Sequence, residues 1–169
     1  MHTRKPEGAL GSACVNRQFD SVCDGSVDTS AANGKTGTLL LDPDTITVGD
    51  GSGATTASGA ATFTSIYETT LESVAATTNI ILQATNEIII SDLSDNNLSL
   101  QQTNGNTVTF QTLRNSISRN TDGNITSSTG DIRFLSSDDT ITTQGGDLIF
   151  EARDDLVIGS LNSNGGDIS

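Results

Sequence analysis

The sequence is short of the side chains that usually fill a protein core. It contains no tryptophan, aromatic residues make up only 4% of it, and hydrophobic residues of all kinds make up 33%. Because large aromatic side chains normally bury much of a core's area, isoleucine, leucine and valine must do most of the packing. This composition argues against a thick sandwich and favours stacked strands around a narrow interior.

Positive charge is also scarce. The chain has eight Lys and Arg against 21 Asp and Glu, a formal net charge of −13, and no basic residue lies between Lys35 and Arg114. Phosphate neutralisation needs clustered Lys and Arg, so the composition argues against nucleic-acid binding, and against attraction to an anionic membrane surface. A high negative charge instead keeps an exposed, strand-rich protein soluble.

Long apolar runs are missing as well. No stretch approaches the ~18 apolar residues that a transmembrane helix requires, and residues 1–20 hold no apolar core of a signal peptide. We therefore expect no membrane insertion and no export signal within the chain. If the protein is secreted, we expect this chain to be a fragment, an internal segment or a mature form without its leader.

The two cysteines, Cys14 and Cys23, both lie in the polar N-terminal segment. A disulfide between them would fit an extracellular protein. Two unpaired thiols are the alternative, and the sequence does not decide between the two. Without a histidine partner, two cysteines cannot complete a closed zinc site.

The chain divides into two parts by pattern. Residues 1–36 show no hydrophobic periodicity, and we predict an irregular N-terminal segment or cap. Residues 37–169 contain short runs with alternating apolar residues between polar turns, which predicts an all-β domain. We expect strands at the following ranges: 38–41, 45–48, 79–84, 87–91, 97–101, 106–111, 124–127, 131–135, 140–143, 147–151 and 155–158.

One short helical insertion is also expected. Ser65 and Glu68 have the spacing of a capping box, in which the two residues satisfy the first free N–H groups of a helix. Ile66, Leu71 and Val74 would then form its apolar side. We expect this helix to lie outside the stack of strands.

An internal repeat is the most informative local pattern. Placing residues 129–144 over residues 145–160 produces these matches: Gly130 with Gly146, Asp131 with Asp147, Ile132 with Leu148, Phe134 with Phe150, and Asp138-Asp139 with Asp154-Asp155. Another copy begins at Gly165-Gly166-Asp167-Ile168. A unit of this kind cannot bury its apolar face alone, so the repeat predicts a β-solenoid, a parallel β-helix with about 20 residues per turn and roughly six or seven turns.

Acidic residues recur in the predicted turns and raise the question of calcium, which takes six to eight oxygen ligands. The candidates are Asp131, Asp138, Asp139, Asp147, Asp154 and Asp155. The nonapeptide pattern of calcium-loaded β-rolls is absent. We therefore expect solvated turns and no cofactor, with calcium binding as the alternative.

Two other functions can be weighed from the residues. A β-helical carbohydrate-active enzyme needs an organised acid/base group in a groove, but the adjacent Asp138 and Asp139 side chains should diverge, and the single histidine, His2, lies near the terminus. An ice-binding array of Thr-x-Thr strands would use residues 45–47, 62–64, 107–109 and 140–142, whose spacing is uneven. We expect no catalysis.

Two segments carry a family resemblance. They are Gly37–Val48, which includes Leu39-Leu40-Leu41-Asp42-Pro43-Asp44, and Asn79–Ile90; the turns Asp138-Asp139-Thr140-Ile141 and Gly145-Gly146-Asp147-Leu148 fit the same pattern. The stretch from about Thr36 to Ser169 resembles the filamentous-haemagglutinin-like exoproteins of the two-partner secretion route. The resemblance implies a right-handed parallel β-helix, passage through an outer-membrane partner pore, and a location outside the cell or on the bacterial cell surface.

The same resemblance implies a function as an adhesin: adhesion to host or neighbouring cells, aggregation, or the building of an extracellular filament or matrix. A stack of this kind that stops within a repeat leaves an unpaired strand edge. We therefore expect either a longer shaft or end-to-end self-association of chains.

Overall fold

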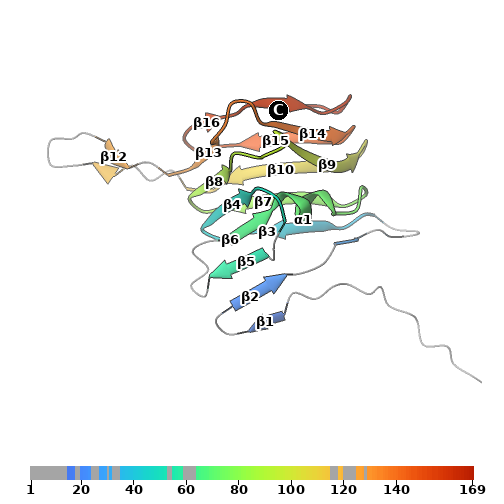
Figure 1. The fold of residues 1–169 in the computed structure, drawn as a ribbon, viewed down its shortest axis with the longest axis horizontal. Helices are drawn as coiled ribbons and strands as arrows, with labels where there is room; N and C mark the ends of the chain where they lie inside the picture. The colour runs from blue at the N-terminus through green and yellow to red at the C-terminus, as the bar shows by residue number, and fades with distance from the viewer. Residues whose placement is uncertain are drawn as a thin grey trace, which may run out of the picture.

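The computed structural model describes residues 15–17, 20–23, 27–29, 31, 35–52, 55–58, 64–114, 118–119, 125–127 and 129–169. This part of the chain is mostly β-structure, with one short helix, α1 (Glu68–Glu72) (Figure 1). Most strands belong to three sheets, called here A, B and C. The prediction of an all-β chain is confirmed.

Parallel ladders form the body of the three sheets. Sheet A joins, in this order, β4 (Thr45–Gly49), β8 (Glu87–Ile90), β13 (Asp131–Phe134) and β16 (Leu156–Val157). Sheet B joins β3 (Thr38–Leu41), β7 (Asn79–Ala84), β10 (Thr107–Thr112) and β15 (Asp147–Glu151). Sheet C joins β9 (Asn97–Thr103), β14 (Thr140–Gln144) and β17 (Ser160–Asn162).

The chain visits these sheets repeatedly in one order. It passes from B to A to C through β7, β8 and β9, then through β10, β13 and β14, and then through β15, β16 and β17. Figure 1 shows the strands of successive passages lying one above another. Equivalent positions in sheet B are 28 residues apart between β7 and β10, 40 apart between β10 and β15, and 20 apart between Asp147 and Asp167.

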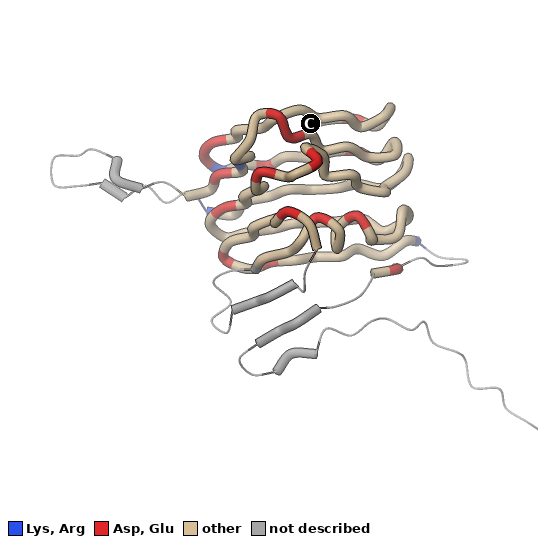
Figure 2. Tube along the Cα trace, in the orientation of Figure 1, with Lys and Arg blue, Asp and Glu red and all other residues tan. Residues whose placement is uncertain are grey.

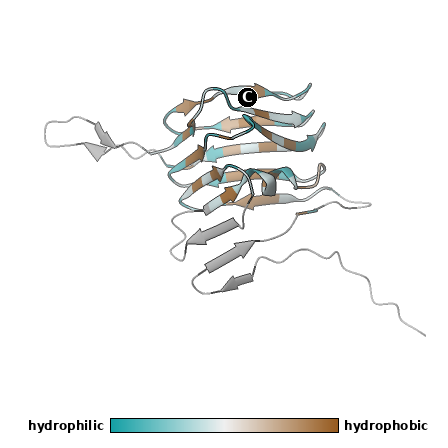
Figure 3. Ribbon diagram, in the orientation of Figure 1, coloured by the Kyte–Doolittle hydropathy of each residue, from teal (hydrophilic) through white to brown (hydrophobic). Residues whose placement is uncertain are grey.

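The ladders place like side chains over one another. Ile46, Ile88 and Ile132 pair in register along sheet A and are all fully buried. In strands such as β7 and β9 every second residue is buried and the residues between them are mostly polar, as the period of two in a strand requires. Figure 3 shows the hydropathy changing along the strands. In sheet B the rings of Phe110 and Phe150 stack with their centroids 5.0 Å apart. The core is therefore narrow and built mainly from aliphatic residues.

Sheet A continues beyond β4 on its N-terminal side. There β6 (Thr64–Tyr67) runs parallel to β4, and β5 (Thr55–Ser58), β2 (Asp20–Cys23) and β1 (Val15–Arg17) follow in antiparallel order. Residues 1–36 were predicted to form an irregular segment or a cap, and β1 and β2 are two short strands within that range. Each strand is very short, and β2 is a strand because it pairs with β5, a partner distant in sequence.

The helix exists but its predicted start is wrong. Ser65 lies in β6, and the residue that precedes the helix is Tyr67, which has an extended backbone and makes no side-chain capping bond. Glu68 accepts a hydrogen bond from the Gly51 N–H at 2.7 Å instead of completing a capping box. Leu71 and Val74 are buried, as the apolar pattern predicted, and α1 packs against β9 and β6.

The predicted repeat of 16 residues does not describe stacked neighbours. Ile132 lies in sheet A between Ile88 and Leu156, whereas Leu148 lies in sheet B between Val108 and Ile168. The sequences at the starts of β13 and β15 are similar, a glycine followed by an aspartate and an aliphatic residue, although the two strands belong to different sheets. The step of 20 residues from Asp147 to Asp167 does join stacked neighbours.

Insertions also make the passages fewer than predicted. The strand order of sheet B contains four strands, in place of roughly six or seven turns. One insertion, after β4, contains β5, β6 and α1; another, after β10, contains the antiparallel pair β11 (Ser118–Arg119) and β12 (Ile125–Ser127). The first insertion lies between β3 and β7, where Thr38 pairs with Asn79, and the second lies in the step of 40 residues between β10 and β15.

Candidate functional site

Carboxylates gather where the chain passes from sheet A to sheet C. We call this group the acidic corner; its members are Asp50, Glu68, Glu72, Asp92, Asp95, Asp138 and Asp139. Glu68 and Glu72 come from α1, and the others follow the ends of β4, β8 and β13. Figure 2 shows acidic residues concentrated at turns of the chain. None of the segments 50–52, 68–72, 91–96 and 135–139 contains Lys or Arg.

Several of these carboxylates organise the backbone. Asp50 Oδ1 accepts a hydrogen bond from the Ser94 N–H at 2.8 Å, and Glu72 Oε1 accepts one from the Ser99 N–H at 2.7 Å. The two oxygens of Asp139 share the Leu93 N–H at 3.3 and 3.4 Å. The corner is thus held together by bonds from backbone N–H groups to carboxylates, between segments that are distant in sequence.

Glu68 and Asp139 are the buried members. Asp139 is fully buried and Glu68 is 6% exposed. Glu68 Oε2 has no hydrogen-bond partner. Burial raises the pKa of Glu68, the bond from Gly51 opposes this, and the charges of Asp95, Asp50 and Glu72 add to it. Sequence reasoning assigned Glu68 to a helix cap and missed its burial, which depends on the 50–52 loop.

The pKa of Asp139 is raised for the same reason as that of Glu68. Burial raises the pKa of Asp139, the Leu93 N–H opposes the shift, and the charges of Asp92, Asp138 and Asp95 add to it. Asp50 is the opposite case, because hydrogen bonds from Ser94 come first among the causes that lower its pKa. The corner therefore combines two buried carboxyls with a raised pKa, Glu68 and Asp139, with one carboxyl, Asp50, whose pKa is lowered.

The raised pKa of Asp139 predicts how stability depends on pH. A carboxyl with a raised pKa binds its proton more tightly in the folded state, so its contribution is complete below its ordinary value of 3.8 and is lost as the pH rises through the raised pKa. We expect the loss in the free energy of unfolding between pH 4 and 7 to be smaller in Asp139→Asn than in the parent chain, measured by urea titration. Asp138→Asn makes the same charge change at an exposed neighbour and is the control. Equal slopes in both variants would contradict the prediction.

The six aspartates considered for calcium lie in separate places. Asp138 and Asp139 belong to the acidic corner, and Asp147 opens β15 in sheet B. Asp131 opens β13 in sheet A, and the segment just before β16 contains Asp154 and Asp155. Within the residues that the structure describes, no group of three His, Cys, Asp or Glu side chains is arranged to hold a metal ion.

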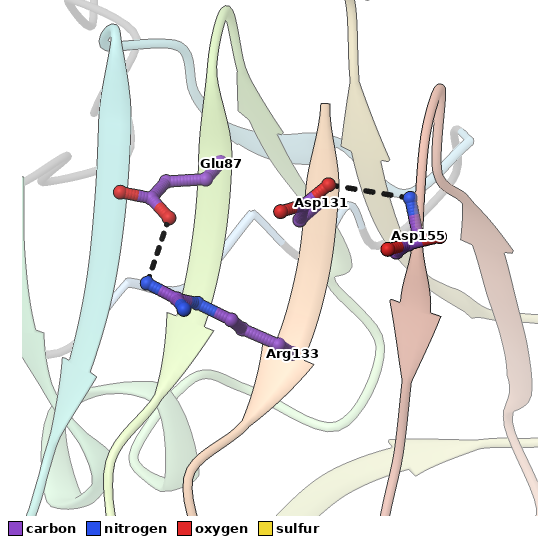
Figure 4. Close-up of polar contacts among 4 residues, drawn as sticks. All are labelled: Glu87, Asp131, Arg133 and Asp155. Carbon is purple, nitrogen blue, oxygen red and sulfur yellow. Dashed lines mark hydrogen bonds and ion pairs between the residues drawn. The ribbon is translucent and has the colours of Figure 1, made fainter. Parts of the chain in front are cut away.

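Two of these aspartates join successive passages of the chain. Asp131 Oδ1 accepts the N–H of Asp155 at 3.2 Å (Figure 4), and Asp147 Oδ1 accepts the N–H of Asp167 at 2.9 Å. Asn79 does the same with the N–H of Thr107, at 2.9 Å. An Asp or Asn at the start of a strand therefore bonds to the start of the strand above it, which fixes the register.

The outer face of sheet A has one ion pair among the described residues. Arg133 Nη2 lies 3.1 Å from Glu87 Oε2, and both side chains are partly exposed (Figure 4). Exposed pairs of this kind contribute at most about 1 kcal/mol to stability. The pair joins the neighbouring strands β13 and β8, whose backbones pair in register.

Comparison with known proteins adds no relative. No family model, curated protein or solved structure matches the chain. Among the described residues, no helix is long and apolar enough to cross a membrane.

The remaining sequence candidates do not meet at one site. The Thr-x-Thr segments 45–47, 107–109 and 140–142 lie in sheets A, B and C respectively, so they do not form one flat array. Residues 62 and 63 of the fourth segment lie outside the described residues, as do His2 and Cys14. Only the backbone of Cys23 is described, in β2, so the pairing of the two cysteines stays a prediction.

Proposed function

We propose that the three sheets form a right-handed parallel β-helix, and that the chain is a non-catalytic, structural and adhesive segment of a secreted bacterial surface exoprotein of the filamentous-haemagglutinin type. The observation that supports this most is the repeated passage through sheets B, A and C in one order, with strands paired in parallel and in register. Stacked architectures of this kind expose long, broad faces suited to contact with large partners.

The outer face of sheet C supports a role in surface contact. Its outward residues are uncharged hydroxyls and amides: Asn97, Ser99, Gln101, Thr140, Thr142, Gln144, Ser160 and Asn162. Such a face offers many hydrogen-bonding groups without the desolvation cost of burying charge. The partners we propose are an outer-membrane secretion pore during export and, afterwards, a host or neighbouring-cell surface.

The adhesive role can be tested with the purified chain. Beads coated with it should bind to cultured epithelial cells or to bacterial cells, or should cluster with one another, more than beads coated with an acidic protein of similar size and charge. Attachment and clustering are counted by microscopy and flow cytometry. If the coated beads neither attach nor cluster above the control level, the adhesive role is wrong.

The chain also offers a surface for end-to-end association, which we propose as part of this role. The terminal strand of sheet A in the described structure, β16, has exposed Leu156 and Val157, and Ile168 is exposed on the adjacent edge of sheet B. Leu156 occupies the inward position that is filled by the fully buried Ile132 one strand below. Covering these side chains with another β-layer would remove apolar surface from water.

We expect Leu156→Lys to shift association toward the single chain, because a charge at this inward position opposes close stacking. Sedimentation velocity over a wide concentration range measures the change. The control is Leu135→Lys, at an exposed leucine that follows β13 in the middle of sheet A. A parent chain that sediments as a single species at every concentration would contradict this part of the proposal.

A further inference from the structure

The helix and the turn after it cover the free edge of sheet C. β9 ends the strand order of this sheet. Its Ser99 N–H is bonded to the Glu72 carboxylate at 2.7 Å, and its Thr103 N–H is bonded to the Ala76 carbonyl at 3.2 Å. The buried side chains of Leu71 and Val74 anchor this cover to the core. Residues 68–78 thus occupy the place that another strand would take beside β9.

Glu68 joins this cover to the loop after β4. Its Oε1 accepts the Gly51 N–H at 2.7 Å, while the Gly51 carbonyl accepts the Thr69 N–H at 3.4 Å and the Thr69 hydroxyl at 3.0 Å. Glu68 Oε2 is buried and has no hydrogen-bond partner. A buried ionised carboxylate needs a donor at each oxygen, and an oxygen left without one destabilises the ionised form.

Among the described residues, the segments around Glu68 contain no Lys or Arg that could compensate its charge. The loop after β4 provides Asp50, the turn before β9 provides Asp92 and Asp95, and α1 itself provides Glu72. β9 has no charged residue, and β6 adds only the phenol of Tyr67. The segment 27–29, whose Val27 carbonyl accepts the Ala75 N–H, adds Asp28. Every charged group in this list is acidic.

We propose that residues 68–78 form a proton-controlled cover over the edge of β9, with Glu68 as the group that controls it. When Glu68 is protonated, its hydroxyl donates to a neighbouring carboxylate, and the cover stays on β9. When Glu68 is ionised, its unpaired buried oxygen among acidic neighbours weakens the cover and exposes the N–H groups of β9. This inference depends on local contacts and is independent of the adhesive role.

The direction of the pH effect follows from Glu68. Because its pKa is raised from 4.5, the closed cover is fully favoured below that value and loses stability as the pH rises through the raised pKa. Between the pKa of Glu68 in the open state and its raised pKa in the closed state, each pH unit lowers the closing equilibrium constant by up to about tenfold. An exposed β9 edge is then available for strand pairing.

Hydrogen exchange of the full chain tests the proposal. Protection of residues 97–103, after division by the intrinsic exchange rate at each pH, should fall at least about fivefold between pH 4.5 and pH 7.5 in the parent chain. In Glu68→Gln it should be nearly constant. Glu87→Gln, at a partly exposed carboxylate paired with Arg133, should retain the parent profile.

A second variant covers the case in which Glu68→Gln fails to fold. Asp95 is exposed, and its Oδ1 accepts the Asn97 N–H at 3.0 Å, a bond that asparagine can keep. Asp95→Asn removes one like charge that raises the pKa of Glu68. The pKa of Glu68 in the closed cover should then lie closer to its ordinary value, so the midpoint of the pH profile should move to lower pH and the total fall in protection by pH 7.5 should be smaller than in the parent chain. A merely structural role for Glu68 predicts no such change.

Two outcomes would overturn the proposal. One is a fall in protection that is the same in Glu68→Gln and in the parent chain. The other is full protection at pH 7.5 in millimolar calcium that is lost in Glu68→Gln, since a cation and not a proton would then neutralise the corner. Protection of strands β10 and β13, measured in the same samples, distinguishes local opening from global unfolding.

Discussion

Replacing Ile88 with alanine is expected to lower the free energy of unfolding by about 2–5 kcal/mol, the range measured for large aliphatic side chains cut back in a core. Ile88 is fully buried in the middle of sheet A, with Ile46 and Ile132 in register on either side. In so narrow a core the neighbours belong to rigid ladders, and they cannot easily collapse into the space. Urea unfolding followed by circular dichroism measures the loss.

The adjacent residue is the control for this prediction. Ile89 has the same side chain on the same strand but points to the outer face and is only partly buried. Ile89→Ala should cost less than about 1 kcal/mol, within the range usual for surface positions. Equal losses in the two variants would mean that the inward and outward faces of β8 are assigned wrongly.

Gly130→Ala is expected to be the second large effect, at about 2–4 kcal/mol. Gly130 has φ 111°, a region that alanine rarely adopts, and a methyl group there would collide with the backbone carbonyl of Arg114. The Gly130 carbonyl also accepts bonds from the Thr112 hydroxyl at 2.6 Å and the Arg153 N–H at 3.0 Å. This residue leads the chain from the β11–β12 insertion back into sheet A, so displacement would disturb the start of β13.

Gly105→Ala separates the two causes. Gly105 also has a positive φ, 88°, but a methyl group there would meet no atom within 4 Å. Its replacement should cost only the conformational penalty, about 1–2 kcal/mol. If thermal or urea unfolding shows the same loss for both glycines, the close approach of Gly130 to Arg114 does not contribute to stability.

The proposed cover over β9 and the pH dependence of Asp139 are two consequences of one feature. The chain concentrates carboxylates at the corner between sheets A and C, where α1 and the turns before β9 and β14 meet. Backbone N–H groups stabilise some of these carboxylates, such as Asp50, and leave others, such as Glu68, incompletely satisfied. None of the described segments at this corner, 50–52, 68–72, 91–96 and 135–139, contains Lys or Arg to neutralise the buried members.

The sequence by itself determined the local elements. The ranges of β3, β7 and β15 agree with the predicted strands, and most others differ by one or two residues at an end. Alternation of apolar and polar residues also identified which side chains of these strands face the core, as in Leu98 and Leu100. This information is local, because the period of a strand is set by its own backbone. Strands β1, β2, β5, β6, β11 and β17 were not predicted. The last of them, Ser160–Asn162, contains a single apolar residue, so it shows no alternation.

Only the tertiary structure decided which strands are neighbours and which acids are buried. The predicted match of Ile132 with Leu148 is wrong because strands of different sheets begin with similar residues. The lengths of the insertions, and not the repeated glycine and aspartate, determine which positions stack. Glu68 looked like a capping residue because its burial comes from the loop at Gly51 and from β9, both distant in sequence. Register and burial are properties of contacts between segments, and such contacts depend on how the whole chain closes on itself.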